Sequence, residues 1–204
     1  MKGFLPRKLL ELAEICPAPL YVVGGSVRDF AAGFPMQGQD FDLSAPLSAE
    51  DFARLATQCG LIARAVYKNT GTVKFSDGDG GDYEFTSFRS DRYVRGIHTP
   101  VEIFFTNDIT ADAKRRDFCM NAVYYDIKQG AIVDPLGGIQ DIQKRTIRTV
   151  DRPEKVFGED GLRLMRLARQ AGQTGFTPDE ACLLGAKKTP HSFGISYPSA
   201  LRRS

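Results

Sequence analysis

Residues 20–29 read Leu-Tyr-Val-Val-Gly-Gly-Ser-Val-Arg-Asp. The apolar run predicts a short buried strand that ends at Gly24 and Gly25, and Ser26 resembles the N-cap of the helix that follows. A strand that ends in two glycines before a helix exposes backbone N–H groups at a positive helix terminus, which suits a phosphate chain. Arg28 lies one turn into this helix and can reach the same anion. The alternative is an ordinary glycine turn.

A pair of acids follows this helix in the sequence Asp40-Phe41-Asp42. The stretch from Phe41 to Leu43 is a candidate strand, and residues i and i+2 of a strand point to the same face of a sheet. Two carboxylates there repel each other unless a cation lies between them, and their hard oxygen atoms suit Mg²⁺. The alternative is a pair of acids in a solvent-facing loop. The glycine turn and the acid pair together are more specific than either feature alone.

The rest of the chain mixes strands and helices without a regular βαβ order. We predict strands at 61–67, 72–75, 83–88, 101–105, 122–126, 131–133 and 147–150. We predict helices at 7–15, at 49–58 and at 137–144, with Ser48 as the N-cap of the second. A further helix is predicted to begin at Pro153 and to resume through 159–171, and the chain is predicted to stay helical to about residue 186. Irregularly spaced helices favour an α+β sheet with helices on one face.

Composition excludes several classes of protein. The chain has 204 residues, of which 42% are apolar, so it can form a sizeable core and is too apolar for a disordered chain. It contains no apolar run near the roughly 20 residues that span a bilayer. Its four cysteines lie far apart, as expected of reduced thiols in a cytoplasmic protein. The net charge of +2 comes from residues 186–204, so the remainder is not a general polyanion binder.

Three later motifs point to one family. Residues 115–122 read Arg-Arg-Asp-Phe-Cys-Met-Asn-Ala, residues 134–138 read Asp-Pro-Leu-Gly-Gly, and residues 159–169 read Glu-Asp-Gly-Leu-Arg-Leu-Met-Arg-Leu-Ala-Arg. With the glycine turn and the acid pair, they resemble the class II tRNA nucleotidyltransferases (CCA-adding enzymes) and bacterial poly(A) polymerases. Gln170 departs from the family pattern, which usually has R-F-A where residues 169–171 read Arg-Gln-Ala.

The resemblance implies an α+β nucleotidyltransferase palm like that of DNA polymerase β, with a mixed or antiparallel sheet and helices on one face, followed by a partial helical neck. It implies transfer of C and/or A from CTP or ATP to the 3′ end of tRNA, with release of pyrophosphate. Asp40 and Asp42 would hold two Mg²⁺ ions that lower the pKa of the RNA 3′-OH and neutralise the leaving phosphates. Glu84 matches the family's third acidic position, and a surface strand charge is its alternative.

The same resemblance extends the nucleotide site beyond the glycine turn to the motif at 115–122. Arg116 would bind the triphosphate, because a guanidinium fork matches phosphate oxygens. Asp117 would accept a hydrogen bond from the ribose 2′-OH and so favour ribonucleotides. The alternative for this motif is a charged helix start.

The motif at 159–169 would select the base. In this reading Asp160 and Arg163 act as a protein template: a carboxylate accepts from the exocyclic amine of C or A, and a guanidinium donates to a ring acceptor. Arg166 and Arg169 would hold the triphosphate or orient Asp160. The alternative is a solvated helix face.

The resemblance also divides the chain. Residues 1–150 are predicted as the head domain, 151–188 as a partial neck with the base-selecting helix, and 189–204 as an irregular, disordered tail. Family members continue into body and tail domains that grip tRNA, so we expect weak tRNA binding here. The neck predicts a homodimer or a partner chain, and no membrane contact is expected. The alternative functions are a poly(A) polymerase and a nucleotide-binding remnant with little RNA activity.

Overall fold

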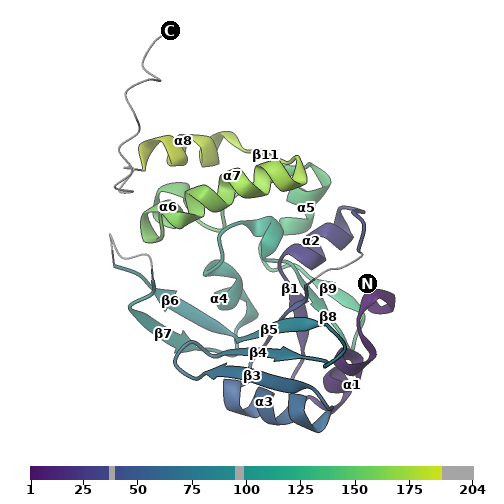
Figure 1. The fold of residues 1–204 in the computed structure, drawn as a ribbon. Helices are drawn as coiled ribbons and strands as arrows, with labels where there is room; N and C mark the ends of the chain where they lie inside the picture. Colours follow the sequence, from purple (N-terminus) through teal and green to yellow (C-terminus); the bar gives the residue numbers. More distant parts are fainter. Residues whose placement is uncertain (37–39, 95–98, 190–204) are drawn as a thin grey trace.

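A seven-stranded sheet forms the centre of the computed structural model, which describes residues 1–36, 40–94 and 99–189 (Figure 1). Its strand order is β3-β4-β5-β2-β1-β8-β9. In that order the strands are Ile62–Tyr67, Thr72–Ser76, Asp82–Ser87, Asp42–Ala45, Tyr21–Val23, Tyr124–Asp126 and Ala131–Val133. Strands β2 and β5 pair in parallel and the other neighbours pair antiparallel, so the sheet is mixed, as the predicted fold class requires.

Helices and short strands surround this sheet. The helices are α1 (Arg7–Ile15), α2 (Gly25–Ala31), α3 (Ala49–Gln58), α4 (Ile109–Lys114), α5 (Gly138–Gln143), α6 (Pro153–Glu159), α7 (Leu162–Thr174) and α8 (Glu180–Lys188). Strands β6 (Arg89–Arg92) and β7 (Glu102–Phe105) form one small antiparallel sheet, and β10 (Thr146–Ile147) and β11 (Thr177–Pro178) form one parallel pair. Figure 1 shows α6, α7 and α8 together at one end of the molecule. In the described ranges, no helix has the length and apolar character needed to cross a bilayer.

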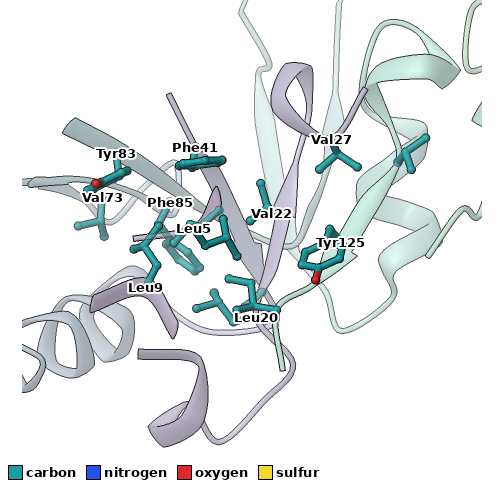
Figure 2. Packing of buried hydrophobic residues seen from close by; sticks show 14 of the residues in the cluster. Leu5, Leu9, Leu20, Val22, Val27, Phe41, Val73, Tyr83, Phe85 and Tyr125 are labelled. Carbon is teal, nitrogen blue, oxygen red and sulfur yellow. The ribbon is translucent and has the colours of Figure 1, made fainter. Parts of the chain in front are cut away.

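The main core lies on one face of the sheet. Val73, Phe75 and Phe85 alternate with polar residues along β4 and β5, so the pleat turns them to the same side. Phe52 of α3 stacks on Phe85, with ring centroids 3.8 Å apart, and meets Phe75 edge to face. Figure 2 shows part of this core, to which Leu5 and other residues of the N-terminal segment belong. Burial of these aromatic rings holds α3 against the sheet.

The opposite face of the same strands is polar. The register places Asp42 of β2 beside Glu84 of β5, and Glu84 beside Lys74 of β4. Asp42 is also paired with Val23 of β1. We call the side of the sheet that bears Asp42 and Glu84 the site face. Helix α3 covers the other side, and Asp42 and Glu84 line a cavity on the site face.

A second, smaller core closes the site face near β1 and β8. Val23 and Tyr124 from these strands pack with Phe88, Ala113 of α4 and Ala122. Helix α4 therefore lies against the site face beside the carboxylates. This packing brings the segment after α4, which contains the motif at 115–122, next to the acid pair.

Local signals predicted several elements correctly, and Ser48 is the clearest case. Its side chain accepts a hydrogen bond from the backbone N–H of Asp51 at the start of α3. The predicted strands at 61–67 and 72–75 and the predicted hairpin of 122–126 with 131–133 are present, as β3, β4 and the pair β8 and β9. Strand β6 was not predicted, because its polar sequence Arg-Ser-Asp-Arg has no strand periodicity and depends on pairing with β7. The predicted strand at 147–150 is reduced to the pair Thr146–Ile147.

Two helix starts differ from the prediction. Helix α2 begins at Gly25 with Gly24 as its N-cap, so Ser26 lies inside the first turn and the N-cap prediction for Ser26 is wrong. Gly24 has φ +86°, a conformation that favours glycine, and this places the turn before Ser26. The predicted helix through 159–171 is broken at Asp160, whose extended backbone separates α6 from α7. Apart from Thr189, the predicted irregular tail lies outside the described residues.

Gly138, in the motif at 134–138, is expected to resist substitution. A Cβ atom there would lie 2.1 Å from the backbone oxygen of Cys119, so Gly138→Ala forces α5 away from this segment. We expect the free energy of unfolding to fall by about 1–3 kcal/mol. Gly172→Ala is the control, because a Cβ there has open space in helix α7 and should add about 0.5–1 kcal/mol. Urea unfolding measures both, and equal stability of the two variants would contradict the close approach.

Candidate active site

A cavity of about 450 Å³ lies where α2, the segment after α4 and α7 meet. Its lining residues are Gly24, Gly25, Arg28, Asp42, Arg115, Arg116, Asp117, Asn121, Asp160, Arg163, Arg166, Arg169 and Gln170. We call it the arginine cavity. A second cavity of about 420 Å³, the acidic cavity, is lined by Asp40, Asp42, Arg64, Ala65, Lys74, Phe75, Asp82, Tyr83 and Glu84. Asp42 belongs to both cavities, so they meet at this carboxylate.

Every site residue predicted from the sequence lines one of these cavities except Ser26. Ser26 is buried inside α2, and the described residues offer its hydroxyl oxygen no hydrogen-bond partner. Gly24 and Gly25 line the arginine cavity beside Arg28. The fold therefore gathers residues from five separate segments around two adjoining cavities, although a role for each residue stays a prediction.

The carboxylates have the chemistry of a divalent-cation site. Asp42 opens into both cavities, yet the surrounding protein desolvates it enough to raise its pKa. Glu84 and Asp40 raise that pKa further by like-charge repulsion, while Arg116 and Arg166 oppose the rise. A bound cation would relieve this repulsion. Within the described ranges, no three acidic, His or Cys residues are close enough to hold a metal ion by themselves. Mg²⁺ usually binds one or two carboxylates together with substrate phosphates and water, so Asp40 and Asp42 are the residues that could hold it.

Arg116 lies between the arginine cavity and a polar cluster behind it. Its Nη2 donates to Asp112 Oδ2 at 3.0 Å, and its Nε donates to the Tyr124 hydroxyl at 3.1 Å. The guanidinium carbon lies 5.2 Å from the centre of the Tyr124 ring. Burial would lower the pKa of Arg116, but Tyr124 and Asp112 raise it, so this residue stays charged.

Asp117 joins the segment after α4 to helix α7. Its Oδ2 accepts from Arg166 Nε at 2.6 Å, and its Oδ1 accepts from the backbone N–H of Phe118 at 2.8 Å and from Asn121 Nδ2 at 3.3 Å. These contacts orient the carboxylate at the rim of the cavity. A carboxylate oxygen accepts up to two hydrogen bonds, so Oδ2 has the capacity to accept from a ligand hydroxyl as well.

Asp160 and Arg163, the predicted base-selecting pair, both line the arginine cavity. Arg163 is 5% exposed and donates to the backbone oxygens of Val156 and Arg115 at 3.2 and 2.9 Å. It also pairs with Glu159 at 3.1 Å. These contacts fix the guanidinium in place between α6, α7 and the segment after α4. Asp160 Oδ1 accepts from the backbone N–H of Leu162, which orients this carboxylate at the start of α7.

Arg28 connects α2 to α7. Its Nη1 donates to Asn121 Oδ1 at 2.9 Å and to Gln170 Oε1 at 2.6 Å, and its Nε donates to Asp29 at 2.9 Å. With 6% exposure, Arg28 braces the two helices across the cavity wall. Its predicted contact with a bound anion stays a prediction. Gln170 supplies one of the acceptors that this buried guanidinium needs.

Sequence reasoning missed three of the residues that hold the arginines: Asp112, Asn121 and Gln170. Two of them could have been noticed in the sequence. Asn121 lies in the motif at 115–122, and Gln170 departs from the R-F-A pattern that the resemblance leads one to expect at residues 169–171. Asp112 precedes Arg115 and Arg116 by three and four residues, the spacing of helical ion pairs. That spacing is common on exposed helices, and burial of Asp112 could not be read from it.

The sequence and the fold match known proteins. A family model described as Poly A polymerase head domain matches residues 20–148. A CCA-adding enzyme of Geobacillus thermodenitrificans is 40% identical over 157 residues, which cover 77% of this chain and 37% of that protein. The crystal structure of the Bacillus stearothermophilus CCA-adding enzyme in complex with CTP has a TM-score of 0.71 at 32% identity, over 90% of this chain and 41% of that one. The chain belongs to this family of CCA-adding enzymes and poly(A) polymerases, through its head domain.

A further solved structure agrees in fold. A tRNA nucleotidyltransferase complexed with a primer tRNA and an incoming ATP analog has a TM-score of 0.67 at 26% identity, over 88% of this chain and 48% of that one. These comparisons confirm the predicted α+β nucleotidyltransferase fold. The chain spans about two fifths of the length of the curated relatives it matches.

Gln170→Leu tests the brace between α2 and α7. Leucine has a similar volume but no acceptor, so one donor of the buried Arg28 guanidinium loses its partner. We expect the free energy of unfolding in urea to fall by about 1–3 kcal/mol. Gln173→Leu is the matched control, because this residue is exposed on the same helix and should change stability by less than about 0.5 kcal/mol. If both variants lose the same free energy of unfolding, the contact between Gln170 and Arg28 does not contribute to stability.

The stability supplied by Asp112 should depend on pH. Burial would raise the pKa of Asp112, but Arg116, Arg115 and the Tyr124 hydroxyl lower it to about 2. A lowered pKa in the folded state stabilises the protein above the unfolded-state pKa near 3.8, and this contribution is lost as the pH falls toward 2. The stability difference between wild type and Asp112→Asn should therefore shrink by roughly 2 kcal/mol over that range. Urea unfolding at several pH values measures it, and a constant difference would contradict the ion-pair assignment.

Proposed function

We propose that this chain carries the catalytic head of a tRNA nucleotidyltransferase that adds C and A from CTP and ATP to the 3′ end of tRNA without a nucleic-acid template. The observation that carries the proposal is the meeting of the arginine cavity and the acidic cavity at Asp42. Nucleotidyl transfer needs a site for a triphosphate and a site for the attacking hydroxyl on either side of the reacting phosphorus. Two cavities that share one carboxylate supply that arrangement.

The arginine cavity is the proposed nucleotide site. Arg116 and Arg166 would contact the triphosphate, because a guanidinium binds phosphate oxygens with two parallel hydrogen bonds. Asp117 would accept from the ribose 2′-OH. Asp160 and Arg163 would form hydrogen bonds with the base, and the fixed position of Arg163 supports this role because selection between bases needs a rigid donor.

The acidic cavity is the proposed place of the RNA 3′ end. Arg64 and Lys74 line it beside the carboxylates, so positive charge is available for the RNA backbone. Asp40 and Asp42 would hold Mg²⁺, with Glu84 beside them. When bound there, the ion lowers the pKa of the 3′-OH and neutralises charge on the transferred phosphate. Asp42 lies at the junction of the two cavities, between the proposed places of the hydroxyl and the α-phosphate, where it would hold the ion.

Nucleotide binding and tRNA binding are separate parts of this proposal. The six arginines that line the arginine cavity support the first part. The stretch that matches the curated CCA-adding enzymes covers about two fifths of their length. The neck is proposed to contact a second copy or another chain. In its support, α7 and α8 expose the apolar side chains of Leu162, Met165, Leu183 and Leu184.

Incubation with tRNA lacking its 3′-terminal CCA, labelled CTP or ATP, and Mg²⁺ tests the proposal. We expect C incorporation from CTP, A incorporation only after C, and no product with EDTA. Substituting both acids, Asp40→Asn with Asp42→Asn, should lower the initial rate roughly a hundredfold or more, since metal-assisted charge stabilisation supplies several kcal/mol. Asp79→Asn is the control, because this acid is exposed in the turn between β4 and β5.

Three outcomes would count against this proposal. A long A tail made from ATP alone would identify a poly(A) polymerase instead. A substantial rate in the double variant would show that these acids do not serve the reaction. Binding of CTP without incorporation at high tRNA concentration would identify a nucleotide-binding remnant.

A further inference from the structure

Asp112 is a fully buried acid behind the wall of the arginine cavity. Its side chain is 0% exposed, and it contacts both arginines that follow α4. Oδ1 accepts from Arg115 Nε at 2.7 Å, and Oδ2 accepts from Arg116 Nη2 at 3.0 Å. Arg115 and Arg116 line the cavity, so one carboxylate outside the cavity sets the direction of two guanidinium groups inside it.

Tyr124 completes the arrangement from the site face of the sheet. Its hydroxyl donates to Asp112 Oδ2 at 2.6 Å and accepts from Arg116 Nε at 3.1 Å. Arg116 is therefore held along its Nε–Nη2 edge by two groups that are themselves hydrogen-bonded to each other. A guanidinium has five donors in a rigid fork, which leaves further N–H groups to bind phosphate oxygens. The register also puts Tyr124 opposite Val23, whose other neighbour is Asp42.

We propose that Asp112 is a positioning residue for triphosphate recognition, which holds Arg115 and Arg116 ready for the terminal phosphates of the nucleotide. This inference rests on the function proposed above. It adds that the preference for a triphosphate over a monophosphate depends on a carboxylate that never touches the nucleotide. The recognised group is the phosphate chain, so the effect should be the same for CTP and ATP.

Two effects of this carboxylate oppose each other, which makes the proposal testable. Its negative charge repels a phosphate chain, so its removal would by itself tighten binding of any polyphosphate. Its hydrogen bonds immobilise two long side chains before the ligand arrives, so their loss adds an entropic cost to binding. The proposal requires the second effect to be the larger one.

Calorimetric titration with CTP and with CMP in the presence of Mg²⁺ separates the two effects. The proteins are wild type, Asp112→Asn and Tyr124→Phe, which keeps the charge and the ring but removes the bridging hydroxyl. We expect Kd for CTP to rise about tenfold in Asp112→Asn and several-fold in Tyr124→Phe. Kd for CMP, measured by competition with CTP, should change less than about twofold, because the missing contacts are to the terminal phosphates.

The control is Asp108→Asn, at the exposed N-cap of the same helix α4, where its side chain accepts from the backbone N–H of Thr110. Asparagine is an equally good N-cap, so both affinities should match wild type. If Asp112→Asn does not fold, Tyr124→Phe carries the same test without a change of charge.

Each other outcome overturns the proposal. Tighter CTP binding by Asp112→Asn would show that the carboxylate acts only through its charge. Equal weakening of CTP and CMP would show a general structural role. If wild type binds CTP, but the ratio of Kd for CTP to Kd for CMP is the same in both variants as in wild type, this inference alone is overturned. Failure of wild type to bind CTP or ATP would overturn the proposed function as well.

Discussion

Positive charge concentrated in one cavity is the constraint on which the rest of this structure depends. Arginines from α2, from the segment after α4 and from α7 line the arginine cavity, where their charges repel each other. The fold meets this repulsion with acids behind or beside them: Asp29 at Arg28, Asp112 at Arg115 and Arg116, Glu159 at Arg163, and Asp117 at Arg166. One of these pairs, Asp117 with Arg166, joins distant segments, so this contact offsets charge and also holds the head against the neck helix α7.

The pleat of the central sheet separates the core from the chemistry. Phe85 and Glu84 are neighbours in β5, yet one stacks on α3 and the other lines the acidic cavity. The parallel pairing of β2 with β5 brings Glu84 to Asp42, and desolvation together with this like charge raises the pKa of Asp42. The acidic cavity therefore carries excess negative charge beside a cavity with excess positive charge, an arrangement suited to a cation and a phosphate chain together.

Short-range chemistry in the sequence predicts a large part of this fold. Ser48 caps α3 through a hydrogen bond that spans three residues, and the alternation in 72–75 and 83–88 shows which side chains enter the core. The ordered motifs identify the family and name nearly every residue that lines the arginine cavity. The errors have local causes as well. Gly24 adopts a positive φ, so the helix starts before Ser26, and an extended Asp160 interrupts the neck helix.

The chemical identity of the site is thus contained in the sequence, since acids, arginines and glycines at fixed spacings are enough to suggest phosphate and metal binding. How these side chains are held depends on contacts between distant residues. Gln170 bonds to Arg28 across 142 positions, and Arg166 reaches Asp117 across 49. Asp112 looks like an ordinary helical acid until the second core buries it between two arginines and Tyr124. Burial and long-range pairing are properties of the packed chain, because no residue's solvent exposure is set by its sequence neighbours alone.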